Sequence, residues 1–263
     1  MRMLAFARRN WKEMLRDPLT LAFGAGFPLV LILLFSLIQK NVPVPLFAPE
    51  KLTPGMIVFG QLFLALFSAQ LISRDRSSAL MMRLLTAPMT AADFILGYVL
   101  PLLPLAAAQG VLCLLAAFAL GLAPGWNALI MLLTMLPGAL CNIALGLICG
   151  SLLTERQVGG ICGALLTNLG AWLSGAWFDL SLVGGAFEAV AHALPYANAV
   201  DAGRAVLAGS FSAATGPLTV VWIYALVLGT LAVVIFPGRC VMRDKDVGIW
   251  YNEGSENSLR RRI

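Results

Sequence analysis

The stretch FILGYVLPLLPLAAAQGVLCLLAAFALGLAPGWNALIMLLTMLPGALCNIALGLICGSLLT, residues 94–154, contains no Asp, Glu, Lys or Arg in 61 consecutive positions. One membrane-spanning helix needs about 20 apolar residues. The stretch therefore has room for two crossings, with the turn GLAPGWN at residues 121–127 between them. Lipid offers no partner for backbone N–H and C=O groups, and the alternation expected of barrel strands is absent. The stretch therefore predicts two membrane helices.

The rest of the chain has the same character. Of its 263 residues, 60% are hydrophobic and 12% are charged, with a mean hydropathy of +0.87, whereas soluble domains are about 25% charged. These values predict an all-α polytopic membrane protein. The pattern contains six expected spans, at residues 19–38, 55–73, 94–120, 128–153, 157–177 and 217–236.

The basic residues predict the orientation, because cytoplasmic loops carry an excess of Lys and Arg. With six spans, both termini lie on one side of the membrane. That side carries 15 of the 18 basic residues: Arg2, Arg8, Arg9, Lys12, Arg16, Arg74, Arg76, Arg83, Arg156, Arg239, Arg243, Lys245, Arg260, Arg261 and Arg262. We therefore expect both termini in the cytoplasm. The net charge of +5 is explained by topology and needs no nucleic-acid partner.

Three segments lie outside the expected spans. Residues 1–18 form an amphipathic pattern that predicts a helix lying in the cytoplasmic membrane interface; the alternative is a basic flank that only orients the first span. Residues 179–214 are divided by glycines and Pro195 into short amphipathic helices expected at the outer face. Residues 237–263 are a basic cytoplasmic tail. Small residues four apart, at Gly146 with Gly150 and at Gly159 with Gly163, predict close helix contacts.

The chain has no visible energy source of its own. The expected spans contain no ionisable residue, which counts against a proton- or sodium-driven carrier. None of the four lysines belongs to the Gly-Lys-Ser/Thr motif of a phosphate-binding loop. No CxxC pair or histidine cluster indicates a metal, and His192 is the single histidine. The protein is therefore either passive or driven by a cytoplasmic partner.

A docking element for such a partner is predicted in SRDRSSALMMRLLTAPMTAADF, residues 73–94. As a helix over about 76–88, it places Leu80 with Leu84, and Met81 with Leu85, on one apolar face beside two arginines, Arg76 and Arg83. An amphipathic helix presented to the cytoplasm suits a groove on another protein. The alternative is a helix that lies on the lipid surface.

With SRDRSSALMMRLLTAPMTAADFILGYVLP and the later LPYANAVDAGRAVLAG, the chain resembles the type-2 permeases of ABC exporters, the type V group. This group includes drug-resistance, nodulation-factor and glycan export permeases. The resemblance covers residues 1 to about 240. It implies two copies of this chain, as a homodimer, bound to two ATPase subunits in the bacterial cytoplasmic membrane. It also implies that residues 76–88 are the coupling helix and residues 2–17 the connecting helix. ATP and magnesium would belong to the ATPase, and this chain would need no cofactor.

In this family the second and fifth spans line a central cavity. The resemblance therefore indicates a substrate-facing surface made of Phe59, Phe63, Phe67, Gln70, Asn168 and Trp172. Such an aromatic stripe with a few amides suits an amphipathic substrate; ordinary helix packing or lipid exposure is the alternative.

The sequence favours a permease subunit that exports a lipophilic drug, antibiotic or lipid-like molecule by alternating access. A glycan or lipid-linked glycan is the second candidate substrate, and a passive channel or a secondary carrier is the rival class. The chain itself is expected to carry no catalytic residue.

Overall fold

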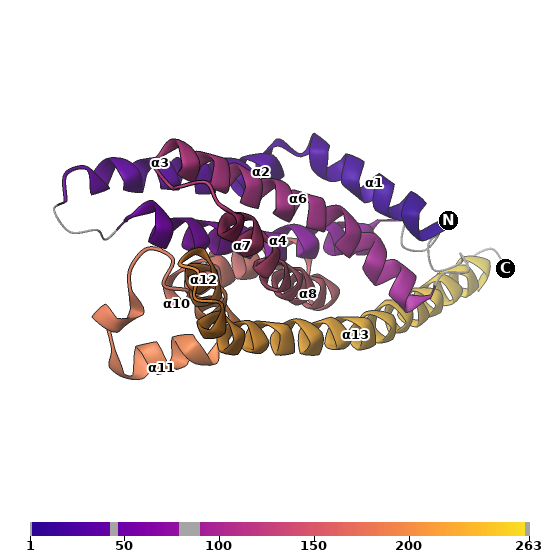
Figure 1. The fold of residues 1–263 in the computed structure, drawn as a ribbon. Helices are drawn as coiled ribbons and strands as arrows, with labels where there is room; N and C mark the ends of the chain where they lie inside the picture. Colours follow the sequence, from indigo (N-terminus) through magenta and orange to yellow (C-terminus); the bar gives the residue numbers. More distant parts are fainter. Residues whose placement is uncertain (1, 43–46, 79–89, 261–263) are drawn as a thin grey trace.

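The computed structural model describes residues 2–42, 47–78 and 90–260, with side chains up to Phe236. The described residues form helices and connecting turns (Figure 1). The elements before the segment at 79–89 are α1 (Arg2–Arg16), α2 (Pro18–Leu21), the π-helical η1 (Ala22–Gly26), α3 (Phe27–Gln39) and α4 (Pro49–Ser77). Those that follow it are α6 (Ala91–Ala119), α7 (Trp126–Thr134), α8 (Leu136–Leu152), α9 (Glu155–Val158), the π-helical η2 (Gly159–Leu166), α10 (Thr167–Leu173), the 3-10 helix η3 (Leu180–Leu182), α11 (Gly185–Ala193), α12 (Pro195–Leu207) and α13 (Phe211–Arg260).

Within the described part of the chain, five helices are long and apolar enough to cross a membrane. They are Pro18–Gln39, Pro49–Ser77, Ala92–Ala119, Trp126–Leu152 and Phe211–Phe236, and they overlap five of the six expected segments. The second of them begins six residues earlier than expected, because the Pro49 end of α4 continues the helix beyond its apolar part.

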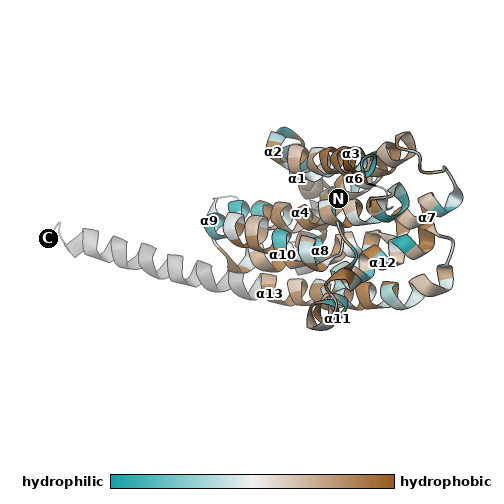
Figure 2. Cartoon of the chain, turned by 90° about the vertical axis from the view of Figure 1, so that its left-hand side faces the viewer, coloured by the Kyte–Doolittle hydropathy of each residue, from teal (hydrophilic) through white to brown (hydrophobic). Residues whose placement is uncertain are grey.

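The second of these helices, α4, is the centre of the molecule. Its most apolar 18-residue window is 89% buried, whereas the corresponding windows of Pro18–Gln39 and Phe211–Phe236 are 17% buried. Figure 1 shows α4 between α3 and α6 on one side and α8 and α13 on the other. Figure 2 shows that the peripheral helices α3 and α13 are largely hydrophobic. Their exposed apolar faces must therefore be covered by lipid or by another protein.

Contact between α4 and α8 is close because α8 carries glycines where the two helices meet. A Cβ on Gly150 would lie 2.6 Å from the carbonyl oxygen of Ala69. Two turns before Gly150 on α8, the carbonyl oxygen of Ile143 accepts a hydrogen bond from Ser68 Oγ of α4, at 3.1 Å. The close contact predicted for Gly146 and Gly150 is confirmed, whereas Gly159 has open space around it.

The expected fifth span is helical from Glu155 to Leu173 but is not among the five long apolar helices. Its middle is π-helical, and its first turn is charged. This segment runs alongside α4 over most of the length of α4. It begins where Arg74 Nε lies 3.3 Å from Glu155 Oε1, and beyond its end a Cβ on Gly55 would lie 2.5 Å from the carbonyl oxygen of Ala176.

The outer segment folds as the short helices η3, α11 and α12 between α10 and α13. The ring of His192 lies 2.9 Å from the carbonyl oxygen of Glu188 and 3.1 Å from Asp201 Oδ2. His192 thus contacts the backbone of its own helix and the carboxylate of Asp201 on α12. Tyr224, in the body of α13, donates to the Ala193 carbonyl oxygen at 2.8 Å.

Candidate functional site

A buried ion pair joins α1 to the last turns of α4. Asp75 is 2% exposed, and its carboxylate accepts hydrogen bonds from both terminal nitrogens of Arg9, each at 2.8 Å. The hydroxyl of Tyr98 on α6 donates to the same carboxylate at 2.9 Å. Two parallel N–H···O bonds fix the orientation of both groups. The carboxylate of Asp75 therefore holds three helices together.

The neighbours of Arg9 complete this cluster. Asn10 accepts a hydrogen bond from Arg9 at 2.9 Å and donates to the carbonyl oxygen of Gly97 at 3.1 Å. Glu13 lies 2.8 Å from Arg9 one turn further along α1. Burial by itself would lower the pKa of Arg9, but the hydrogen bond and the charge of Asp75 outweigh it and raise that pKa above its ordinary value. The pairing with Asp75 thus favours the charged form of Arg9.

Aromatic packing reinforces the same junction. The ring of Phe6 lies edge-on to Tyr98, with centroids 5.0 Å apart, and to Phe94 at 6.1 Å. Phe236 of α13 reaches the same place, 5.7 Å from Phe94 and 6.3 Å from Tyr98. Gly97 leaves room for Phe6, because a Cβ at that position would occupy the space of its ring. The N-terminal helix α1 and the Phe236 region of α13 therefore meet at this junction.

This junction lies directly beside the start of the predicted coupling segment, residues 76–88. Arg76 does not begin a separate helix, as the sequence suggested; it belongs to α4, which ends at Ser77, and Ser78 is extended. Its guanidinium donates to the carbonyl oxygen of Gly150 at 2.7 Å, which ties the end of α4 to α8. The chain returns at Thr90, whose side chain caps α6 in a capping box with Asp93. The remaining predicted coupling residues, Leu80, Met81, Arg83, Leu84 and Leu85, lie outside the described residues.

The predicted cavity residues of α4 are covered by protein in this structure. Phe59, Phe63 and Phe67 are 4%, 7% and 3% exposed. Phe63 packs against Phe23 and Phe27 of the first span, with ring centroids 5.7 Å and 6.2 Å apart. A substrate that contacted these rings would have to enter between α4 and the first span.

The predicted cavity residues of α10 face outward from the protomer. Trp172 is 51% exposed, and Asn168 is also exposed, with its amide nitrogen 2.7 Å from the carbonyl oxygen of Ala164 in the same segment. Trp177 connects the two predicted stripes, because its ring lies 5.7 Å from Trp172 and 5.5 Å from Phe59. Sequence reasoning missed Trp177, which follows the turn after α10, where helical spacing no longer applies.

Gln70 lies at the Phe67 end of these aromatic rings. It is half-buried in a small crevice between α4 and the first helices, beside Phe67, Met14, Asp17 and Arg74. Ring contacts through Trp177 therefore link four of the six predicted cavity residues, Phe59, Phe63, Phe67 and Trp172, whereas Asn168 bonds within its own segment and Gln70 lies toward the Asp75 end of α4.

Five long apolar helices among the described residues define the chain as a multi-pass membrane protein. The sequence matches the model of the ABC-2 type transporter family over residues 1–208. The chain therefore belongs to the ABC-2 type transporter family and is the permease subunit of an ABC-type transporter. Members of this family typically work with an ATP-binding subunit. No curated protein sequence matches the chain.

Proposed function

We propose that this permease exports a lipophilic or amphipathic molecule by alternating access, driven by a separate ATPase that docks on the 79–89 segment. The observation that carries the proposal is the junction at Asp75. The segment leaves from Ser78 and returns at Thr90, and both ends are fixed to helices that α1 also contacts. Movement of a docked ATPase would thus be passed to α4 and α6 together.

We also propose that the chain crosses the membrane six times, in the bacterial cytoplasmic membrane. The segment from Glu155 to Leu173 begins beside Arg74 and ends beside the Gly55 end of α4, so it covers the same thickness as α4. Six crossings place α1 and the end of the last span on one side. The contacts of Phe236 with Phe94 and Tyr98 support this arrangement, and the basic residues make that side cytoplasmic.

The proposed complex contains two copies of this chain. The outward-facing Trp172 and Asn168 on α10, and the exposed apolar face of the first span, suit a partner more than lipid, because an amide facing lipid is costly. The rings of Phe59 and Phe63 would then lie behind the cavity between the copies. This surface carries aromatic and amide groups rather than charges, which favours a lipophilic or amphipathic substrate over a glycan.

The test of docking is co-purification of a tagged permease with its ATPase, together with ATP hydrolysis. Leu84→Ala should weaken docking about tenfold to a hundredfold, because burying a Leu side chain contributes roughly 1.5–3 kcal/mol. Leu84→Asp should weaken it further, since the groove would then hold an unpaired charge. Arg83→Ala is the matched control and should cost about 0–1 kcal/mol. If Leu84→Asp left the ATPase bound and fully stimulated, the segment would lie on lipid and docking would be excluded.

A further inference from the structure

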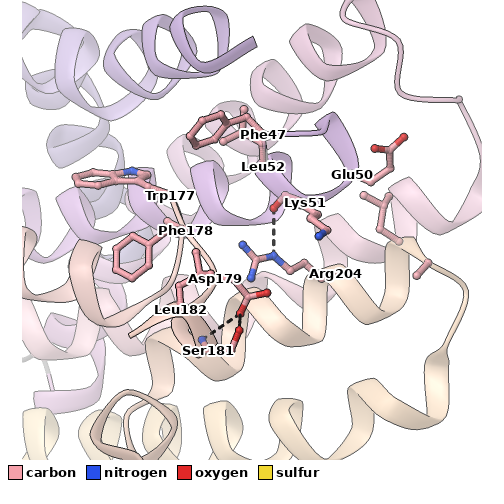
Figure 3. A pocket seen from close by; sticks show the side chains of 13 residues that line it. Phe47, Glu50, Lys51, Leu52, Trp177, Phe178, Asp179, Ser181, Leu182 and Arg204 are labelled. Atoms are coloured by element: carbon pink, nitrogen blue, oxygen red, sulfur yellow. Dashed lines mark hydrogen bonds between the residues drawn. The ribbon is translucent and has the colours of Figure 1, made fainter. Parts of the chain in front are cut away.

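A pocket of about 560 Å³ lies at the end of α4 remote from Asp75 (Figure 3). Its walls come from the first turn of α4, the loop after α10, and the second half of α12. Aromatic and aliphatic side chains make the apolar wall: Phe47, Leu52, Trp177, Phe178 and Leu182. The volume is in the range of sites that enclose a drug-sized molecule.

Arg204 of α12 is the cation at the centre of this pocket. Its Nε donates to the carbonyl oxygen of Lys51 at 3.2 Å and its Nη2 to that of Gly175 at 2.8 Å. These acceptors are neutral, and the nearest carboxylate, Asp201, lies 3.9 Å away and also contacts His192. Burial lowers the pKa of Arg204, while the charges of Asp201 and Asp179 oppose that effect. The positive charge of Arg204 is thus positioned by carbonyl groups and only partly balanced.

Two further charged groups face the same space. Lys51 is exposed, and within the described part of the chain no residue accepts a hydrogen bond or forms an ion pair with its ammonium group. The carboxylate of Asp179 is taken by the backbone and hydroxyl of Ser181, at 3.2 and 2.9 Å. Glu50 points away from Arg204 in Figure 3. Lys51 is therefore the charged group beside Arg204 that no hydrogen bond or ion pair engages among the described residues, while Glu50 lines the pocket further from Arg204.

The pocket is continuous with the aromatic residues described above. Trp177 is part of its wall and also lies 5.5 Å from Phe59. Phe178, in the same wall, lies 5.9 Å from Trp172. An apolar chain lying against Trp172 and Trp177 would thus have its polar end close to Lys51 and Arg204.

We propose that this pocket binds the anionic head of the exported molecule, a phosphate or carboxylate held by Lys51 and Arg204, with its apolar body against Phe47, Trp177 and Phe178. The assignment rests on the proposed export function and narrows its substrate to anionic amphiphiles. On the proposed topology the pocket opens at the outer face, where it serves as the last binding site before release.

The test measures Trp177 fluorescence in full-length chain reconstituted in phosphatidylcholine nanodiscs. The other five tryptophans are replaced by Phe: Trp11→Phe, Trp126→Phe, Trp172→Phe, Trp222→Phe and Trp250→Phe. The probes are a tail-brominated dodecyl phosphate and the same tail with a trimethylammonium head, since bromine quenches a neighbouring indole. We expect saturable quenching by the phosphate, with an apparent Kd at least about tenfold lower than for the ammonium probe.

Lys51→Gln should raise the apparent Kd for the phosphate probe about tenfold, because a charge-assisted hydrogen bond is lost. The matched control is Lys40→Gln, which removes a lysine outside the pocket on the same expected side, and it should leave the Kd unchanged. Equal quenching by both probes, or an unchanged Kd in Lys51→Gln, would exclude the anionic site. If phosphatidylglycerol in the nanodisc abolished the quenching, the occupant would be a membrane lipid and not a substrate.

These outcomes are independent of ATPase docking. Lys51 lies at the end of α4 opposite to the docking segment. The Lys51→Gln variant should therefore still co-purify with the ATPase. If the Lys51→Gln variant lost probe binding but still bound the ATPase, the result would identify the ligand chemistry of the pocket. It would leave the proposed export function unchanged. If the protein bound the probe but did not bind the ATPase, the proposed export function would be refuted. The proposed anionic site would still be supported.

Discussion

Asp75 is a buried carboxylate near the charged end of a helix whose middle is apolar. Such a group is costly to bury unless it is paired and fully hydrogen-bonded. Asp75 has two bonds from Arg9 and one from Tyr98. Arg9 and Tyr98 come from two other helices. The hydrogen bonds that stabilise the charge of Asp75 therefore also attach those helices to α4.

Asp75→Ala should therefore destabilise the protein by about 2–3 kcal/mol, because it leaves Arg9 and Tyr98 without their shared acceptor. Arg74→Ala, in the adjacent position, should cost about 0–1 kcal/mol, since the pair of Arg74 with Glu155 is exposed. The measurement is unfolding of the purified variants in a denaturing-detergent titration. Similar losses for Asp75→Ala and Arg74→Ala would contradict the role given to the buried pair.

Sequence reasoning could not find this cluster, because nothing local links its members. Asp75 is separated from Arg9 by 66 positions and from Tyr98 by 23. The sequence places Asp75 only in a charged segment after the second span, where most charges would be solvated. The polar contacts of α8 are equally unpredictable from local sequence, because the amide nitrogen of Asn142 donates to Gly138 in its own helix, whereas Ser68 of α4 bonds across to α8.

At the scale of elements, the contact between α4 and α8 depends on small residues that let the two backbones approach. Without hydrophobic attraction between helices in lipid, close packing and hydrogen bonds between helices supply most of the association. Gly150 contacts the backbone of α4 directly, and it also supplies the carbonyl oxygen that Arg76 binds.

Gly150→Ala should destabilise the protein by about 1–3 kcal/mol, because its Cβ would lie 2.6 Å from the Ala69 carbonyl oxygen and must push α8 away from α4. Gly159→Ala is the matched control. Its Cβ would meet nothing within 4 Å, so this variant should be neutral or slightly stabilised, because Ala favours a helix. Equal stability of the two variants would show that α8 can adjust without cost.

Hydropathy was sufficient to predict five long helices, because each is a continuous apolar run of adequate length. It also predicted a span at residues 157–177; this segment is helical from Glu155 to Leu173 but is not among the five long apolar helices of the described residues. The end of α4 was also misplaced by a few residues, because Arg76 remains helical through its bond to α8. Charge alone does not separate a helix end from a loop.

At the scale of the whole molecule, the two ends of the helix layer differ in chemistry. One end carries α1 and the Asp75 cluster, and the other carries α11, α12 and the pocket around Arg204 (Figure 1). The proposed alternating access would use this difference. The ATPase would act at one face, and the substrate would be released at the other. The helices that run between the two faces would connect them.

Accessibility labelling tests this division. In a background without the five native cysteines, Lys51→Cys and Ser212→Cys should react with a membrane-impermeant reagent in intact cells, whereas Ser78→Cys and Asp246→Cys should react only after permeabilisation. The expectation follows from the distribution of basic residues and from six crossings. Labelling of Ser78→Cys from outside would reverse the orientation, and labelling of Asp246→Cys alone would indicate an odd number of crossings.

The link between Arg9 and Asp75 also determines the order in which the protein can be assembled during synthesis. Arg9 leaves the ribosome long before its partner, so α1 must wait, undocked, while the first span and α4 are made and inserted. Tyr98 arrives later still, and only then is the carboxylate of Asp75 enclosed on all sides. The N-terminal helix is thus the first element to be translated, and its attachment to α4 and α6 can be completed only after α6 has been made.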